Sequence, residues 1–370
     1  MSTAAFQTET LPLDASLFEG GGQVIRICIG LRAKREDPGL KPQHVSGLKL
    51  VQNIFQADLQ GGIARSKEIY FKPNEVNNSI NTFIADTQTA GSITLLIQIS
   101  LPPLLFSAPP PKSKLFLPPR SKKVILKGGS AVNAAPPIDF LTEIFKPIVE
   151  REFGLNFDVS IIRRGYYPRG GGEVELRVDP IVEKSLKPSN LVERGKIVKF
   201  GKQIVESASK ILTEAALFEL ESIQFDIEIN TERYNTCKGS DILLWAETSS
   251  GCLISGHALS DKKLSPEEIG RRAAEELIRN IKHGGCVDEY LQDQLIMFMA
   301  LAEGKSNLVS GPITSHTRAA IHFVEVMSGV KFCIKKLDSF DSNVQDDKSE
   351  DGNLYLIECE GIGLKISKQL

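Results

Sequence analysis

Hydrophobic and polar positions follow two different patterns along this chain. Some segments are short strand-like runs. Other segments repeat apolar residues every three to four positions, which predicts amphipathic helices. Because strand-like and helix-like segments alternate throughout, the pattern indicates an α+β or α/β protein without a long all-helical or all-β region. The runs that predict strands are KEIYFKP, KVILKGG, GEVELRV, DILLWAET and LYLIECEG.

The segment LSPEEIGRRAAEELIRNIKHGG predicts one of the clearest helices. Ser265 can cap its N-terminus, Pro266 suits the first helical position, and Glu268 can complete a capping box. Gly284 is expected to end the helix. The apolar stripe consists of Ile269, Ala273, Leu277 and Ile281, with Ala274 and Ile278 beside it.

A second helix is predicted over VDEYLQDQLIMFMALAEG. Tyr290, Asp293 and Gln294 stand at helical spacing, so they share one polar face. An aromatic ring, a carboxylate and an amide could together hold a purine base and its ribose. An ordinary polar helix surface is the alternative. The buried stripe is expected to consist of Leu291, Leu295, Phe298 and Ala302.

The stretch GPITSHTRAAIHFVE predicts a third helix with a histidine at its start. Thr314 or Ser315 can cap this helix. His316 stands four residues before Ala320, in line with the expected core face, whereas His322 points away from it. The start of a helix attracts anions and disfavours imidazolium, so a neutral His316 beside a phosphate could be a nucleophile. A structural histidine is the alternative. The expected core face is Ala320, Phe323, Val324 and Met327.

Two glycine triplets precede apolar runs. In FEGGGQVIRI a helix is expected to start near Gly22, which would let Glu19 and Arg26 face one ligand two turns apart. A tight structural turn with solvated charges explains the same residues. In RRGYYPRGGGEV the second triplet is flanked by arginines and two tyrosines, which suit phosphates and bases. An ordinary hairpin explains that segment equally well.

Composition sets outer limits on the function. At 370 residues the chain is long enough for two domains, or for one large domain with an insertion. A net charge of −2 excludes a bulk polyanion binder, and the absence of a long apolar run predicts no membrane span. The opening MSTAAFQTETLPLDAS does not have the pattern of a secretory signal. Six cysteines without a C-x-x-C pair predict reduced, buried thiols and no zinc site.

Taken together, these segments resemble the RNA 3'-terminal phosphate cyclase family. The matching segments occur in the family's order over nearly the whole chain. They are EGGGQVIR, PGLKPQHVSGL, ADTQTAGS, KGGS with APPIDF, RGYYPRGGGEV, VDEYLQDQL and GPITSHTRAAIHF.

The resemblance implies an α+β fold. A large domain would contain three similar βα units, each with two helices on a four-stranded sheet. A smaller α/β domain would be inserted into it. The boundaries implied are 1–182 and 284–370 for the large catalytic domain and 183–283 for the inserted small domain.

The resemblance also implies an ATP-dependent reaction on RNA with a 3'-phosphate end. A histidine takes AMP from ATP, AMP passes to the RNA 3'-phosphate, and the adjacent 2'-OH closes a 2',3'-cyclic phosphate. By position, the nucleophile falls on His316, and Glu19 matches a carboxylate that binds a divalent metal, Mg²⁺ or Mn²⁺. The implied nucleotide contacts are Gln98, Pro136, Tyr290, Asp293 and Gln294. The implied contacts to the RNA end are Arg26, Arg35, Gln43 and His44.

Two segments are shorter than the family's pattern. Between GGGQVIRICIGL and PGL the family has a further helix and strand, and here only RAKRED intervenes, which affects the placement of Arg35. A similar shortening follows ERGKIVKFGK, whereas the loop SAPPPKSKLFLPPRSKK is longer than the family needs.

The competing function is that of a cyclase-like nucleolar scaffold without catalysis, which serves ribosomal RNA processing. Such a scaffold has no need for His316 together with Gln98, Tyr290 and Asp293. An enolpyruvyl-transferring enzyme of related architecture is a more distant alternative. Resemblance to eukaryotic members implies a nuclear location, with the cytoplasm as a second possibility, and the oligomeric state stays open.

Overall fold

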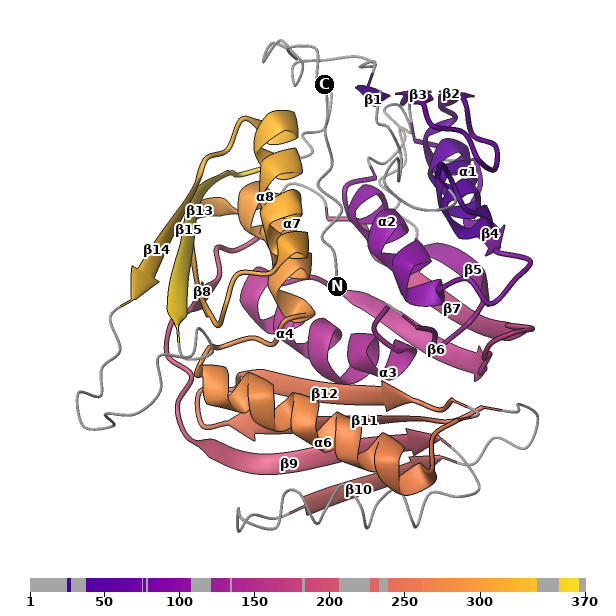
Figure 1. Ribbon diagram of the computed structural model, residues 1–370. Helices are drawn as coiled ribbons and strands as arrows, with labels where there is room; N and C mark the ends of the chain where they lie inside the picture. Colours follow the sequence, from indigo (N-terminus) through magenta and orange to yellow (C-terminus); the bar gives the residue numbers. More distant parts are fainter. Residues whose placement is uncertain are drawn as a thin grey trace. The chain divides into compact units, whose positions relative to one another are not determined.

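The computed structural model (Figure 1) shows helices and strands interspersed along the chain, which confirms the α+β class. Contacts divide the chain into two units. The first comprises Met1–Ser130, Asn156–Ser185 and Lys365–Leu370, and the second comprises Ala131–Leu155 and Leu186–Leu364. The domain boundaries expected from the sequence stay a prediction. The structure describes residues 25–27, 38–74, 76–77, 79–107, 121–133, 135–181, 184–205, 227–232, 239–261, 263–337 and 353–365.

A three-stranded antiparallel sheet in the first unit has the strand order β1-β3-β2. Strand β1 corrects the expectation of a helix after the first glycine triplet. The β-branched residues Ile25 and Ile27 favour extended backbone, and the segment pairs with β3, so Arg26 lies in a strand. The elements are β1 (Ile25–Ile27), α1 (Pro42–Phe55), β2 (Asp58–Gln60) and β3 (Ile69–Lys72).

The second sheet of this unit has the order β4-β5-β7-β6. Strands β4 and β5 are parallel, and the other two pairings are antiparallel. Inward residues alternate along β5 and β7, where Leu126 and Leu176 are fully buried. Helix α2 contacts both of these strands and packs beside α1. The elements are β4 (Thr82–Asp86), α2 (Ile93–Leu105), β5 (Lys122–Gly128), β6 (Phe157–Arg163) and β7 (Gly172–Val178).

One sheet of the second unit repeats this topology. Its order is β14-β15-β13-β8, with β8 parallel to β13 and the other two pairings antiparallel. Helices α7 and α8 lie side by side against it (Figure 1), with α7 in contact with β15 and β13. The elements are β8 (Asn190–Leu191), α7 (Leu291–Leu301), β13 (Glu303–Ser310), α8 (Ser315–Ser328), β14 (Phe332–Leu337) and β15 (Leu354–Ile362).

The other sheet of the second unit has the order β10-β9-β11-β12 and is covered by α6 (Figure 1). Buried residues of β11, β12 and α6 form a core of their own, which includes Ile242, Leu244, Ile254 and Leu277. The elements are β9 (Ile197–Val205), β10 (Ile227–Glu232), β11 (Asp241–Thr248), β12 (Leu253–Leu259) and α6 (Pro266–His283). Before them in the chain lie α3 (Ile138–Phe140), a π-helical turn (Leu141–Phe145) and α4 (Lys146–Phe153).

Most of the predicted elements are confirmed. Strands β7 and β11 occupy the predicted residues, and α6 begins with Ser265 accepting the Glu268 N–H at 3.2 Å and ends at Gly284 in the left-handed region. The capping box is wrong, because the Glu268 carboxylate pairs instead with Arg271 and Arg272.

The described residues also test the predictions for the cysteine thiols and for membrane-spanning helices. Cys252, Cys286 and Cys359 are free and buried, as expected. Cys333 is free but exposed, because it lies on the outward side of β14. None of the helices in the described ranges is long and apolar enough to cross a bilayer.

Candidate active site

His316 occupies the first turn of α8. Thr314 is the N-cap, and its hydroxyl accepts the Thr317 N–H at 3.0 Å, so the structure chooses between the two predicted caps. The predicted core face is only partly correct. Ala320, Phe323 and Val324 are half-buried, but Met327 is exposed. The fully buried residues of α8 are Thr317 and Ile321. His316 therefore does not point along the buried face, and its side chain is exposed.

His322 is exposed as predicted, and its ring contacts the neighbouring Phe323 edge-on at a centroid distance of 5.6 Å. The two histidines of α8 thus differ in position rather than in burial. Only His316 lies at the helix start, where backbone N–H groups have no partners within the helix and can meet an anion.

Gln292 in α7 holds the chain that leads into α8. Its Oε1 accepts the Thr314 N–H at 3.0 Å and the Thr317 hydroxyl at 2.5 Å. Its Nε2 donates to the Pro312 carbonyl at 3.3 Å and also to the hydroxyl of Ser310. The amide is buried, so these bonds replace those it would make with water. Gln292 fixes the backbone on both sides of the α8 N-cap.

Sequence analysis missed Gln292. It lies between the predicted polar residues, but its i+3 and i+4 neighbours are Leu295 and Ile296, both fully buried. A polar residue on the apolar stripe of a helix was the signal that could have identified it, because a buried amide needs hydrogen-bond partners.

Asp293 lies within electrostatic range of His316. It is half-buried on α7, and α7 packs against α8. Burial raises the pKa of the Asp293 carboxyl to about 6, and the positive charge of a protonated His316 acts in the opposite direction. The structure therefore brings together the predicted nucleophile and one predicted nucleotide contact.

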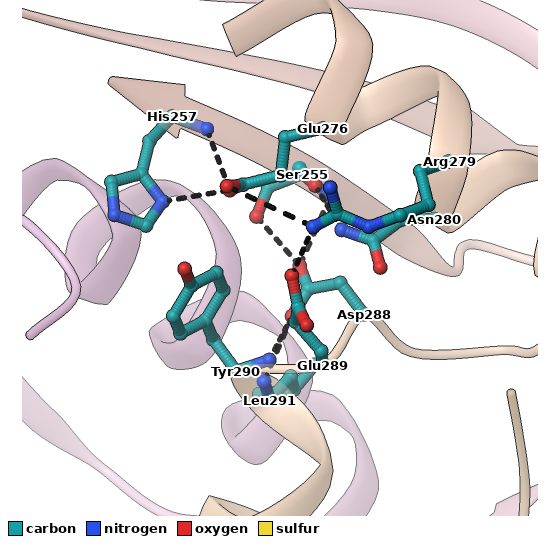
Figure 2. Close-up of polar contacts among 9 residues, drawn as sticks. All are labelled: Ser255, His257, Glu276, Arg279, Asn280, Asp288, Glu289, Tyr290 and Leu291. Carbon is teal, nitrogen blue, oxygen red and sulfur yellow. Dashed lines mark hydrogen bonds and ion pairs between the residues drawn. The ribbon is translucent and has the colours of Figure 1, made fainter. Parts of the chain in front are cut away.

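Tyr290 directly precedes α7 and is fixed through its backbone (Figure 2). The buried carboxylate of Asp288 accepts the N–H groups of Tyr290 at 3.0 Å and Leu291 at 2.8 Å. The same carboxylate accepts the backbone N–H of Ser255 at 3.0 Å and its hydroxyl at 2.6 Å. Burial raises the pKa of Asp288 to about 6, although these four donors favour its ionised form. Asp288 therefore ties the start of α7 to β12.

The Tyr290 ring lies between two other rings. Its centroid is 4.8 Å from that of His257 and 6.2 Å from that of Phe140, and both contacts are edge-to-face. Burial raises the pKa of the Tyr290 hydroxyl, and the negative charge of Glu276 raises it further, so the hydroxyl stays protonated. Phe140 belongs to α3, whose N-cap Pro137 directly follows Pro136, so the ring contact of Phe140 brings the segment after Pro136 to Tyr290.

His257 is oriented by Glu276 of α6, as Figure 2 shows. The Glu276 Oε1 lies 3.1 Å from the His257 Nδ1 and also accepts the His257 backbone N–H at 3.0 Å. The buried His257 Nδ1 makes no hydrogen bond, so Glu276 holds His257 through its backbone N–H. Arg279 bridges Glu276, at 3.9 Å, and Glu289.

A hollow of about 140 Å³ lies beside the segment that precedes α8. The residues that line it include Glu289, Gln292 and the segment from Gly311 to Thr314. The hollow thus adjoins the chain that leads into α8.

The two remaining candidates for nucleotide contacts, Gln294 and Gln98, have no described contact with His316 or with the Tyr290 ring. Gln294 donates to the Tyr290 carbonyl at 2.8 Å, so its amide supports the start of α7. Gln98 is half-buried on α2 in the first unit, and its part in the site stays a prediction.

The candidates for the RNA end lie in the first unit. The Gln43 Oε1 accepts the N–H of Ser92, the N-cap of α2, at 3.3 Å. The His44 Nδ1 accepts the Lys41 N–H at 3.0 Å, which caps α1. Glu19, Arg35 and the side chain of Arg26 lie outside the described residues.

The metal prediction rests on Glu19 and is therefore untested. In the part of the chain that the structure describes, no group of three histidine, cysteine, aspartate or glutamate side chains could hold a metal ion. The residues of α7 and the start of α8 offer groups that suit a nucleotide, namely an aromatic ring, a carboxylate and the N–H groups of a helix start.

Comparison with known proteins shows which family the chain resembles. A family model described as RNA 3'-terminal phosphate cyclase matches residues 18–334. A probable RNA 3'-terminal phosphate cyclase of Dictyostelium discoideum is 34% identical over 98% of this chain and 86% of its own length. The RNA 3'-terminal phosphate cyclases of Drosophila melanogaster and Pyrobaculum aerophilum are 32% and 33% identical, each over 95% of this chain and 97% and 98% of their own lengths.

The chain is thus an α+β protein that matches a family of enzymes along most of its length. It belongs to the RNA 3'-terminal phosphate cyclase family. The resemblance stated from the sequence motifs is confirmed at this level.

Proposed function

We propose that this protein converts the 3'-phosphate end of RNA to a 2',3'-cyclic phosphate at the expense of ATP. Family membership supports the reaction. The observation that carries the mechanism is the exposed His316 in the first turn of α8, with Asp293 of α7 in electrostatic range.

In the first step a ring nitrogen of His316 attacks the α-phosphorus of ATP. A phosphorus–nitrogen bond forms, the bond to the bridging oxygen breaks, and pyrophosphate leaves with the electron pair. Backbone N–H groups at the start of α8 stabilise the negative charge that develops on the phosphorus oxygens. Gln292 keeps these N–H groups in place through Thr314 and Thr317.

In the second step an oxygen of the RNA 3'-phosphate attacks the AMP phosphorus and the bond to His316 breaks. The 2'-oxygen then attacks the RNA phosphorus, loses its proton to solvent, and AMP leaves. The 2'-OH lies next to the activated phosphate in the same ribose, so ring closure needs little further positioning. Gln43 and His44, at the start of α1, are proposed to bind the RNA phosphate together with Arg26 and Arg35.

The nucleotide is proposed to bind against Tyr290, with Pro136, Gln98 and Gln294 as further contacts. Asp293 is placed to bind the ribose and to stabilise a positively charged His316. A divalent metal bound through Glu19 would neutralise the triphosphate. We further propose nuclear action, on the basis of the resemblance to eukaryotic members.

The three-unit architecture is part of the same proposal. It is supported by the shared order and direction of the β4-β5-β7-β6 and β8-β13-β15-β14 strands. The order β1-β3-β2 corresponds to β5-β7-β6, and the described residues contain no counterpart of β4 for this sheet. The sheet with α6 would belong to the insert.

The test is incubation of the full chain with α-labelled ATP and a divalent metal, followed by denaturing electrophoresis. We expect protein-bound label that is labile to acid and stable to base, as a phosphoramidate should be. When RNA with a 3'-phosphate is added, we expect its end to be converted to the 2',3'-cyclic phosphate. No label and no cyclisation by the folded protein would contradict the proposal and favour a non-catalytic scaffold in ribosomal RNA processing.

A further inference from the structure

The loop between β6 and β7 presents an exposed aromatic ring and two exposed arginines. We call residues 163–172, RRGYYPRGGG, the tyrosine loop. The side chain of Tyr167 is 77% exposed, whereas its neighbour Tyr166 is buried. Arg163 and Arg169 are exposed on the same loop. Single exposed apolar residues are common on protein surfaces, so exposure alone assigns no role to Tyr167.

The backbone of the tyrosine loop is held at several points. The Gly170 N–H donates to the Tyr166 carbonyl at 2.7 Å, which closes the turn. Ser130 bonds Gly165 in both directions, with its N–H at 2.8 Å from the Gly165 carbonyl and its hydroxyl at 3.0 Å from the Gly165 nitrogen. The Arg163 Nε donates to the Gly171 carbonyl at 2.6 Å. A ring on such a loop loses little entropy when a ligand stacks on it.

The tyrosine loop adjoins the residues proposed to bind the RNA end. Gly170 packs so closely on the turn before α2 that a Cβ there would lie 2.4 Å from the Thr89 carbonyl oxygen. In the same turn, a Cβ on Gly91 would lie 2.7 Å from the Gln43 Cβ. Together with the bond from Ser92 to Gln43, these contacts connect the tyrosine loop to the start of α1 within the first unit.

The charges of this surface suit a polyanion. Within the described part of the chain, neither Arg163 nor Arg169 forms an ion pair with a carboxylate. By contrast, Lys123, Lys127 and Arg177 on the neighbouring strands all pair with glutamates. Of these five basic residues, the two without an ion pair in the described part of the chain both lie on the loop that carries the exposed ring.

We propose that the tyrosine loop binds the RNA strand upstream of its 3'-terminal nucleotide, with Tyr167 stacked on a base and Arg163 and Arg169 on backbone phosphates. This rests on the proposed function for the nature of the substrate. Stacking on an aromatic ring tolerates any base, so the loop holds RNA ends of different sequence.

Direct binding tests the stacking. A fluorescent oligonucleotide with a 3'-phosphate is titrated with the full chain in the absence of ATP, and the dissociation constant is measured by anisotropy. We expect Tyr167→Ala to weaken binding about 10-fold, and Tyr167→Phe, which keeps the ring, to bind like the wild type. Ile84→Ala is the matched control, because Ile84 is a 60% exposed apolar residue on β4 of the same unit. Thermal unfolding verifies that each variant is folded.

A mononucleotide competitor separates strand from phosphate recognition. A nucleoside 3'-phosphate has no upstream nucleotide, so its affinity should be the same for Tyr167→Ala and wild type. Arg163→Ala and Arg169→Ala should each lower the slope of log affinity against log salt by about 1, and Arg177→Ala should not. Unchanged oligonucleotide affinity in folded Tyr167→Ala, or an equal loss for the mononucleotide, overturns the proposal.

The same variants distinguish this proposal from the proposed function. Protein-bound label from α-labelled ATP requires no RNA, so Tyr167→Ala should retain it. If the wild type binds RNA through the tyrosine loop but takes up no label, the catalytic proposal fails and the loop proposal stands. If label forms and Tyr167→Ala cyclises the oligonucleotide with an unchanged KM, the loop proposal fails and the catalytic proposal stands.

Discussion

Two helices that follow the second strand of matching sheets begin in opposite surroundings. After β5 the chain enters α3, where the first turn from Ile138 to Phe140 is buried and Pro137 caps without a side-chain bond. After β13 it enters α8, where Ser315 and His316 are exposed and Thr314 caps through its hydroxyl. His316 and Asp139 both occupy the second helical position. Topology therefore repeats, but only the α8 start is open to a ligand.

The difference has a local cause. The first turn of α3 continues into a π-helical turn rich in buried apolar residues, so it belongs to a core. Gln292 holds the chain before α8 by hydrogen bonds to the Pro312 carbonyl, the Thr314 N–H and the Thr317 hydroxyl. Ser315 and His316, in the same turn, stay exposed. The packing of one copy thus leaves a helix start exposed, and this is the position of the proposed nucleophile His316.

The largest expected effect is the loss of protein-bound label when His316, the exposed side chain at the start of α8, is replaced. His316→Ala or His316→Asn should reduce protein-bound label from α-labelled ATP by more than about 100-fold, because no other ring nitrogen lies at this helix start. His322→Ala, one and a half turns further on, should label like the wild type. Persistent label in the His316 variants would assign the nucleophile elsewhere.

A second effect concerns the carboxylate that faces the α8 start. The folded pKa of Asp293, about 6, exceeds its ordinary value of 3.8, so the folded protein binds more protons between these values. The free energy of unfolding should therefore fall as the pH rises from about 4 to about 6, by up to about 3 kcal/mol from this group.

Urea unfolding at several pH values measures this slope. Asp293→Asn should remove the contribution, and Asp58→Asn, at an exposed carboxylate on β2, should not. Equal slopes for wild type and Asp293→Asn would show that burial does not hold a proton on Asp293. The same variant should bind ATP more weakly in a calorimetric titration.

A slightly smaller effect on the free energy of unfolding is expected from removing Gln292, which holds the start of α8. Gln292→Leu leaves the Thr314 N–H and the Thr317 hydroxyl without their acceptor, so we expect about 2 kcal/mol of destabilisation and slower label uptake. Gln52→Leu is the matched control, since the side-chain amide of this α1 residue donates to the Ala57 carbonyl at 3.2 Å and has no proposed part in the site. A similar rate of label uptake in both variants would mean that Gln292 does not position the α8 start.

The smallest effect concerns α1, whose start lies in the first unit. His44→Ala removes the bond from the Lys41 N–H, which should cost about 1 kcal/mol of unfolding free energy. Because His44 is proposed to bind the RNA phosphate, label uptake should be normal and the KM for 3'-phosphate RNA should rise. Normal kinetics with RNA would limit His44 to a capping role.

The sequence by itself determined the elements and the family. Strand β7 and helix α6 follow from local patterns, because alternation and helix caps act between residues close in the chain. Motif order was sufficient for the resemblance that the comparisons confirm. Periodicity also selected Tyr290, Asp293 and His316, although it did not settle their roles.

Only the tertiary structure decided which faces are covered. The buried side of α8 runs through Thr317 and Ile321, since α7 packs there and Gln292 bonds Thr317, and this contact joins positions 25 residues apart. Ile25 and Ile27 form a strand because β3 offers them backbone partners. Burial of Asp293 and the placement of the tyrosine loop beside Gln43 depend in the same way on segments distant in sequence. Local propensity does not contain that information, because hydrogen-bond partners and desolvation come from those distant segments.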